Sequence, residues 1–110
     1  MRLLVLGGSR FVGHAIVCAA RDVGWEVTTF NRGLSGADAA DVVVLRGDRT
    51  RSDDLARLAA GPWDAVVDTS GFVPRETLAV AKRLEQVARR YVLREALARK
   101  AICVVRMSLN

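Results

Sequence analysis

The chain has 110 residues, 51% of them hydrophobic, and a formal net charge of +5. That length suffices for one small domain with its own hydrophobic core, but not for two. Eight Lys and Arg residues but only two Glu residues lie between residues 82 and 106. The basic charge is therefore a property of the C-terminal quarter and not of the whole chain.

Targeting segments and metal or redox motifs are not apparent. No stretch reaches the roughly 20 apolar residues of a membrane span. Arg10 and His14 interrupt the apolar segment near the N-terminus, which argues against a secretory signal. Cys18 and Cys103 lie far apart, without CxxC spacing, and are interpreted as buried free thiols rather than zinc ligands or a redox pair. We expect a cytoplasmic protein that is not in contact with a membrane.

The first third of the chain alternates between strand and helix patterns. The apolar run Leu3–Leu6 predicts a strand that is buried on both faces, as in a parallel sheet. From Phe11 onward apolar residues recur at helical spacing, and Gly24 is placed to end this helix. A second strand is predicted over residues 25–30, followed by a loop over residues 33–41 that is rich in Gly, Ser and Asp.

The alternation continues through the middle of the chain. A third strand is predicted over residues 42–45 and a fourth over residues 63–68. Between them lies a short helix with Ser52 as its N-cap, which Gly61-Pro62 ends. Pro74 fits the first turn of another helix. These elements predict an α/β fold, a Rossmann-like doubly wound parallel sheet with right-handed crossovers.

The last helix has an inconsistent apolar pattern. One apolar face is centred on Leu84 and extends to Tyr91, but Leu93 and Leu97 fall on the opposite side. Tyr91 to Leu93 could also begin a fifth strand, and Ile102 to Met107 could be a replacement strand or a frayed tail. We therefore expect a sheet truncated after about four strands, followed by an irregular basic C-terminal helix or tail. We expect residues 1–92 to form a Rossmann-like half-domain and residues 93–110 to form a divergent basic tail.

The clearest functional signal is the glycine-rich segment between the first strand and the first helix. Its residues are Gly7, Gly8, Ser9, Arg10, Phe11, Val12 and Gly13. Glycines let the backbone turn and approach a pyrophosphate, which the N–H groups of a helix N-terminus can bind. Arg10 occupies the middle position of a G-x-x-G-x-x-G spacing, where its guanidinium suits phosphate. A tight turn without a ligand is the alternative interpretation.

Further candidate residues follow the other strands at their carboxyl ends. Asn31 and Arg32 end the second strand without an acidic residue, which favours NADP over NAD, unless Arg32 is only a solvated loop residue. Asp48 is a candidate acceptor for the adenine edge, or a turn-forming residue. The segment Thr69-Ser70-Gly71 lies where the ribose and pyrophosphate of a dinucleotide should run.

Several of these motifs together carry a family resemblance. They are Gly7-Gly8-Ser9-Arg10-Phe11-Val12-Gly13, Asn31-Arg32-Gly33, Gly47-Asp48 and Val66-Val67-Asp68-Thr69-Ser70-Gly71. In combination they resemble the N-terminal half of an NAD-dependent epimerase/dehydratase, an extended or atypical short-chain dehydrogenase/reductase. The Arg10 variant is similar to the branch that includes chloroplast stem-loop RNA-binding relatives. The resemblance covers about residues 1–92 and implies a dinucleotide cofactor, NADP or NAD.

The same resemblance shows which catalytic residues are missing. Members of that family use a Ser or Thr after the fifth strand and a Tyr-x-x-x-Lys pair for proton transfer. Tyr91 is the only tyrosine, and Glu95 stands four residues later where lysine would be required. The resemblance thus implies an NAD(P)-binding fragment without complete catalytic machinery and with no assigned catalytic residue. Either a reading-frame change after about Leu93 or a natural minimal module would explain the tail.

Two other functions are compatible with the chain. A partner chain could complete an active oxidoreductase or epimerase, and the basic segment from Lys82 to Arg106 could bind nucleic acid. A solvated helix face and a disordered tail are the preferred explanation of that segment, so nucleic acid is not the expected partner. A short sheet also has an exposed edge, through which the chain could associate with itself. We expect His14 to be structural, and Trp25 and Trp63 to pack at the rim of the core.

Overall fold

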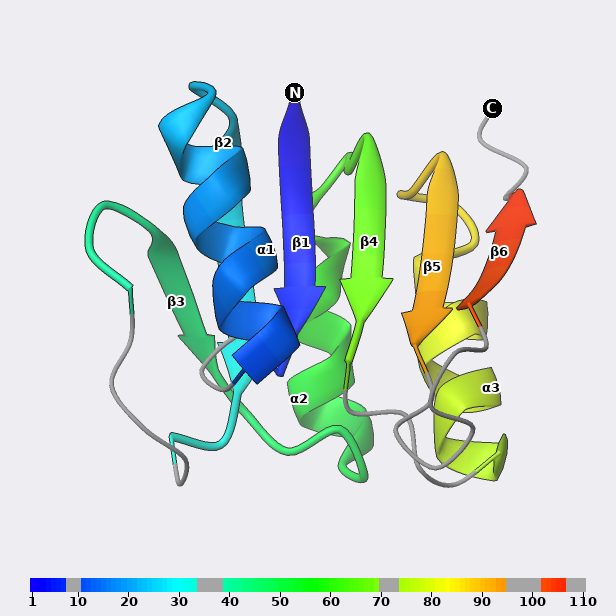
Figure 1. Ribbon diagram of the computed structural model, residues 1–110. Helices are drawn as coiled ribbons and strands as arrows, with labels where there is room; N and C mark the ends of the chain where they lie inside the picture. Colours follow the sequence, from blue (N-terminus) through cyan, green and yellow to red (C-terminus); the bar gives the residue numbers. More distant parts are fainter. Residues whose placement is uncertain (8–10, 34–38, 70–73, 95–101, 107–110) are drawn as a thin grey trace.

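The computed structural model describes residues 1–7, 11–33, 39–69, 74–94 and 102–106 (Figure 1). Within them one sheet contains the strands β1 (Arg2–Leu6), β2 (Glu26–Asn31), β3 (Val43–Arg46), β4 (Ala65–Asp68), β5 (Arg90–Arg94) and β6 (Ile102–Arg106). The helical segments are α1 (Phe11–Asp22), α2 (Ser52–Ala56), the 3-10 helix η1 (Arg57–Ala60) and α3 (Pro74–Leu84). No helix in this described part of the chain is long and apolar enough to cross a membrane.

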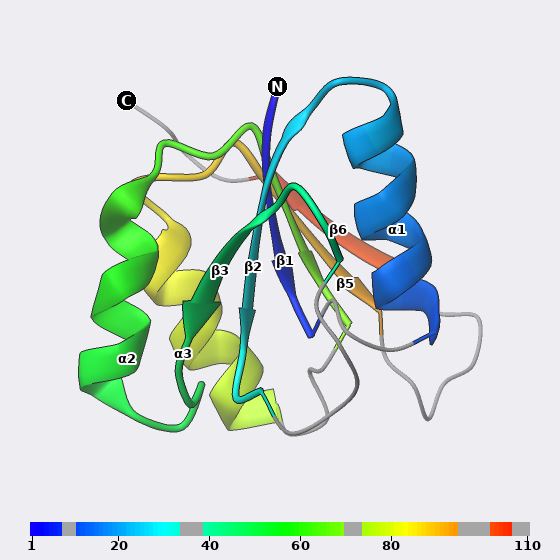
Figure 2. The same cartoon turned by 90° about the vertical axis from the view of Figure 1, so that its left-hand side faces the viewer.

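The strand order is β3-β2-β1-β4-β5-β6. The first five strands of this order run parallel to one another, and β6 pairs antiparallel with β5. Helix α1 covers one face of the sheet, whereas α2 and α3 cover the other (Figures 1 and 2). The expected Rossmann-like, doubly wound parallel sheet is therefore confirmed.

Local sequence signals predicted several helix ends correctly. Gly24 follows the end of α1 with a φ of 87°, a backbone conformation that favours glycine. Helix α3 begins at Pro74, and η1 ends at Ala60, directly before the Gly61-Pro62 stop. The N-cap prediction for α2 was wrong. Ser52 is the first helical residue, and Arg51 holds the N-cap position without a side-chain cap.

The expected long last helix is shorter than its apolar pattern indicated. Helix α3 ends at Leu84, whose carbonyl accepts hydrogen bonds from the N–H groups of Val87 (2.9 Å) and Ala88 (2.9 Å). The N–H of Trp63 then donates to the Val87 carbonyl (2.6 Å), and the N–H of Arg89 donates to the Trp63 carbonyl (3.1 Å). These bonds direct the chain into β5 beside β4, so Tyr91 lies in a strand and not on a helix.

The sheet also extends beyond the four strands that were expected. Strand β5 pairs with β4, and β6 takes the position that we had considered for a replacement strand. Residues 95–101, which belong to the segment where we expected an irregular basic helix or tail, lie outside the described residues. A hairpin-like pair of strands thus ends the sheet at the β5 side.

The larger core lies between the sheet and the helices α2 and α3. Its buried residues are Leu4, Leu6, Phe30, Leu55, Leu58, Trp63, Val66, Val80, Leu84 and Ala88. Trp63 is part of this core and only 2% of it is exposed, with the Arg2 guanidinium 4.9 Å from the centre of its ring. Its indole Nε1 donates to the Leu58 carbonyl at 2.9 Å, so the one polar atom of the ring is satisfied.

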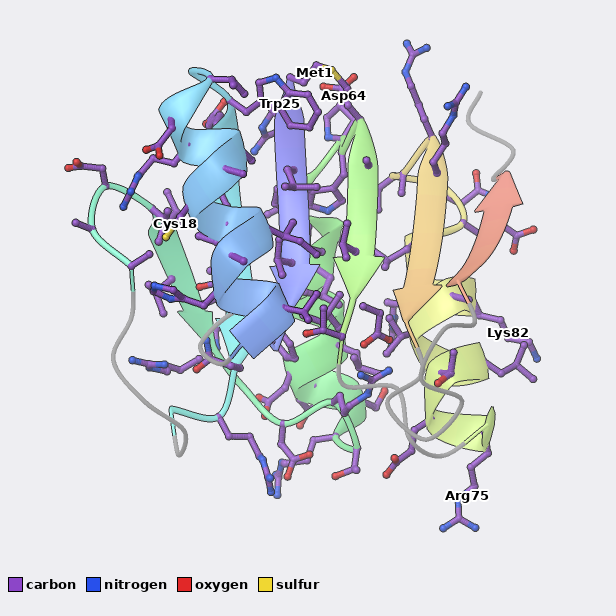
Figure 3. The ribbon with its side chains drawn as sticks, in the orientation of Figure 1. Met1, Cys18, Trp25, Asp64, Arg75 and Lys82 are labelled. Atoms are coloured by element: carbon purple, nitrogen blue, oxygen red, sulfur yellow. The ribbon has the colours of Figure 1, made fainter. Side chains whose placement is uncertain are left out.

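A smaller core lies under α1 on the other face. Its buried residues are Leu3, Val5, Val17, Ala20 and Val27. Trp25 is half-buried and packs against this cluster at the amino edge of the sheet, near Met1 and Asp64 (Figure 3). Because β1 contributes to both cores, its residues 3–6 are at most 2% exposed.

The placement of Leu58 predicts a large effect on stability. Leu58 is fully buried, and Leu58→Ala should lower the free energy of unfolding by about 2–5 kcal/mol through lost burial and a new cavity. Leu78→Ala is the matched control, because Leu78 is 55% exposed and should change stability by less than about 0.5 kcal/mol. Urea unfolding followed by circular dichroism measures both. Equal losses in the two variants would contradict the packing described above.

Candidate functional site at the carboxyl edge of the sheet

The parallel strands bring four chain segments to one edge of the sheet. The carboxyl ends of β1, β2, β3 and β4 lie side by side, at the arrowheads in Figure 1. The strand order reverses at β1, because the chain places β2 and β3 on one side of it and β4 on the other. Ligands of open α/β sheets bind in the crevice that such a reversal creates.

Gly7 forms the turn that leaves β1. Its φ of 84° lies in the left-handed region, and its N–H donates to the carbonyl of Phe30 at 3.0 Å. On the other side, the hydroxyl of Thr69 donates to the carbonyls of Leu6 (2.8 Å) and Gly7 (3.2 Å). The turn is thus held between the ends of β2 and β4 and leads toward the N-terminus of α1.

The remaining residues of the predicted glycine segment divide into two groups. Helix α1 begins at Phe11, Val12 is 37% exposed, and Gly13 is buried in the first turn. Gly8, Ser9 and Arg10 lie outside the described residues, as do Ser70 and Gly71 after β4. The structure therefore brings Gly7, the start of α1 and Thr69 together at the edge.

Asn31 organises the end of β2. Its Oδ1 accepts hydrogen bonds from the N–H of Gly33 (2.8 Å) and from the guanidinium of Arg46. Its Nδ2 is buried and has no hydrogen-bond partner among the described residues. Gly33 has a φ of 76°, and a Cβ there would lie 3.1 Å from Arg46 Cζ. Arg32 between them is exposed, so two arginines flank this strand end.

Arg46 was not singled out from the sequence. It is the last residue of β3 and the register partner of Asn31. The signal that could have identified it is its position, since the predicted parallel pairing places the last residues of neighbouring strands together. Sequence reasoning considered only the residues that follow a strand in the chain.

Asp48 shapes the turn after β3. Its Oδ1 accepts hydrogen bonds from the N–H (2.8 Å) and the hydroxyl (2.6 Å) of Thr50. The side-chain hydrogen bond of Thr50, its backbone hydrogen bond and the nearby charges of Arg32 and Arg51 hold the pKa of Asp48 below its ordinary value. Its own N–H donates to Asp54 Oδ2 at 2.8 Å. The edge therefore carries an ionised carboxylate at Asp48, near Arg32 at the end of β2.

A buried ion pair lies at the same edge. Arg49 donates from Nη1 to Oδ1 of Asp68 (2.8 Å) and from Nη2 to Oδ2 (2.6 Å). The side chain of Asp68 is fully buried, and that of Arg49 is 12% exposed. This pair was also missed from the sequence. The available signal was an aspartate at the end of an otherwise apolar strand, because a buried carboxylate needs a cationic partner.

His14 and Cys18 lie away from these residues, one turn apart on α1. The imidazole Nε2 is 3.4 Å from the Cys18 thiol, which is free and half-buried (Figure 3 labels Cys18). The thiol that we expected to be buried at Cys18 is only partly buried, and the side chain of Cys103 lies outside the described residues. In the part of the chain that the structure describes, no three His, Cys, Asp or Glu side chains are grouped to hold a metal ion.

Comparison with protein families identifies a family to which most of the chain matches. The model of the NAD dependent epimerase/dehydratase family matches residues 3–102. The match is longer than the stretch of about 92 residues on which the resemblance was based, and it includes β5. Comparison with curated protein sequences finds no match.

Solved structures with the same fold are larger than this chain. WbmG from Bordetella bronchiseptica, solved in complex with NAD, is 18% identical with a TM-score of 0.72, over 84% of this chain and 36% of that one. UDP-glucose 4-epimerase from Thermotoga maritima, solved with UDP-glucose, is 14% identical with a TM-score of 0.72, over 84% and 37%. A short chain dehydrogenase family protein from Francisella tularensis is 16% identical with a TM-score of 0.65, over 80% and 46%. The chain thus spans less than half of each protein, and the likeness is one of fold.

The turn after β3 makes a pH-dependent prediction. Thr50→Val removes the side-chain hydrogen bond to Asp48, which is the largest cause of its lowered pKa, so the pKa should rise toward its ordinary value. A carboxyl group whose pKa is lowered by folding stabilises the folded state above its ordinary pKa, and this stability is lost as the pH falls through the lowered pKa. Thr50→Val should therefore have part of this stability missing near neutral pH.

Carbon-13 NMR titration of the Asp48 carboxyl measures this shift. Thr77→Val, which changes a threonine on α3, is the matched control and should leave the titration curve in place. An unchanged titration curve of Asp48 in Thr50→Val would show that the Thr50 hydroxyl does not lower the pKa of this carboxyl group.

Proposed function

Because this chain belongs to the NAD dependent epimerase/dehydratase family, we propose that it binds a nicotinamide adenine dinucleotide across the carboxyl edge of its sheet. The observation that carries the proposal is the Gly7 turn at the point where the strand order reverses. Its positive φ turns the chain directly from β1 toward the N-terminus of α1, where N–H groups and the helix dipole favour a pyrophosphate. We assign the pyrophosphate to the segment from Gly7 to Gly13.

The residues at this edge fit such a cofactor. The buried Nδ2 of Asn31 has no partner among the described residues and is a donor available to a ribose hydroxyl or phosphate oxygen. Thr69 fixes the turn through the carbonyls of Leu6 and Gly7 and begins the segment that we assign to the ribose, Thr69-Ser70-Gly71. Asp48 is ionised near neutral pH and is assigned as the acceptor for the adenine amino group.

We further propose a preference for NADP over NAD. A carboxylate at the end of the second strand would accept hydrogen bonds from the adenosine ribose, but this chain has Asn31 there. Arg32 is exposed beside it, and Arg46 contacts its amide oxygen. The exposed guanidinium group of Arg32, beside an amide instead of that carboxylate, suits a 2′-phosphate.

Catalysis by this chain alone is not part of the proposal. A bound nicotinamide would supply hydride transfer. In the family that the chain resembles, a Tyr-x-x-x-Lys pair carries out the proton transfer. Tyr91 is the only tyrosine of the sequence and lies in β5, with Glu95 four residues later. We therefore propose a nucleotide-binding unit with little or no turnover of its own.

Titration of the purified protein with NADPH and NADH tests both proposals. NADPH should bind more tightly, and Arg32→Ala should weaken NADPH binding about tenfold while changing NADH binding less than about twofold, since only NADPH has the extra phosphate. Arg89→Ala is the matched control, because Arg89 is 70% exposed beside Asp64 at the opposite edge of the sheet. Binding of neither cofactor would overturn the proposed function, and tighter binding of NADH would overturn the preference alone.

A further inference from the structure

We propose that the Arg49–Asp68 ion pair is a positioning element, which holds the loop after β3 at a fixed place relative to the Gly7 turn. This inference rests on the proposed nucleotide binding, for which the two segments form opposite halves of the site. The loop over residues 47–51 carries the adenine-side carboxylate, and the turn carries the pyrophosphate side. The pair would set the distance between these halves before any ligand arrives.

The path of the pair across the sheet supports this role. In the sheet order, β2 and β1 lie between β3 and β4. Arg49 leaves the loop after β3, yet its guanidinium reaches the carboxylate at the end of β4. Asp68 is two residues after Val66, so it faces the side of the sheet that carries the larger core. The ion pair therefore spans the carboxyl ends of the two intervening strands, at the end of the larger core that lies next to the candidate site.

Each partner is itself anchored to one half of the site. Thr69, next to Asp68, donates its N–H (3.0 Å) and its hydroxyl (2.8 Å) to the Leu6 carbonyl, directly before the glycine turn. On the other side, the N–H of Gly47 donates to the Asn31 carbonyl at 3.0 Å. The N–H of Arg51 donates to the Asp48 carbonyl at 3.0 Å. A displacement of either partner would thus move the segment next to it.

Close packing makes the loop depend on this anchor. A Cβ at Gly47 would lie 2.7 Å from Phe30 Cε2, so the loop passes directly over that ring with no room to shift inward. Outward movement is opposed by the two hydrogen bonds between Arg49 and Asp68. Because Asp68 is fully buried, loss of the two hydrogen bonds from Arg49 would destabilise its charge in the core.

The same geometry distinguishes Arg49 from Arg32, which follows the end of β2. Its two terminal nitrogens are directed at the buried carboxylate, whose negative charge offsets its own. Arg32, in contrast, is exposed at the edge. Arg49 should therefore affect both cofactors equally through the loop, whereas a residue that touches the 2′-phosphate should affect NADPH alone.

The experiment compares Arg49→Lys with Val80→Ala. Lysine keeps the charge but cannot form the planar two-bond contact, so the loop should loosen while the carboxylate stays paired. Dissociation constants are measured at a temperature where circular dichroism shows every variant folded. We expect Arg49→Lys to weaken NADPH and NADH about tenfold each, with their ratio unchanged. Val80→Ala removes packing in the same core, at a fully buried residue, and should leave both constants unchanged.

Amide hydrogen exchange without ligand provides the second measurement. The N–H of Asp48 donates to Asp54 Oδ2 and the N–H of Arg51 donates to the Asp48 carbonyl, and both should exchange faster in Arg49→Lys than in the wild type and in Val80→Ala. If Arg49→Lys does not fold, the double variant Arg49→Met with Asp68→Val replaces the pair with apolar side chains and leaves no buried charge unpaired. It should show the same faster exchange.

The outcomes separate the two proposals. Unchanged exchange in the loop, or unchanged affinity for both cofactors, would overturn the positioning role of the pair. A selective loss of NADPH binding would also overturn it, because Arg49 would then contact the phosphate. Failure of the wild type to bind either cofactor would overturn the proposed function, while the exchange measurement still decides whether the pair orders the loop.

Discussion

The pairing of β1 with both β2 and β4 is the constraint on which the rest of the structure depends. Residues 3–6 of this strand are at most 2% exposed, because each face is covered by a separate core. A strand in that position must be parallel to both neighbours for helices to cross over on both faces. The carboxyl ends of the strands then meet at one edge, and every residue of the candidate site follows from that meeting.

Charge at this edge is distributed unevenly. Toward β2 and β3, Arg32 and Arg46 flank a neutral amide at Asn31. Toward β4, the charge of Arg49 is offset by a carboxylate in the interior. The overall positive charge of the chain therefore says little about this site, because most of the excess lies in the C-terminal quarter. What matters is which guanidinium groups retain access to a ligand.

The parallel sheet and the positions of its first four strands along the chain could be predicted because their signals are local. Apolar runs of strand length, Gly24 after the first helix and Pro74 at the start of another lie within a few residues of the boundaries they determine. The end of the last helix could not be predicted in this way. Val87 and Ala88 continue the helical spacing of α3, and only the backbone pairing of Trp63 with this segment removes them from the helix.

The candidate site, too, could be predicted only where its residues directly follow predicted strands. Gly7 and Thr69 follow predicted strands, so their meeting at the edge could be expected from parallel pairing. Arg49 and Asp68 are 19 residues apart, and Arg49 follows β3, which is not a neighbour of β4 in the sheet. Their contact depends on how far the loop after β3 folds back over Phe30, which no periodic pattern records. Contacts of this kind can be predicted only when the three-dimensional path of the loop is known.

The antiparallel strand β6 has a consequence for how this sheet could be enlarged. A further parallel strand beside β5 would need β5's outer hydrogen-bonding groups, and β6 already uses these from Arg90 to Arg94. Reversal of direction also removes the need for a crossover helix at this point. Within the described sheet, any additional strand would have to join at β3, where Val43 is 54% exposed, or at β6. The direction in which β6 runs thus determines where the winding of the sheet stops.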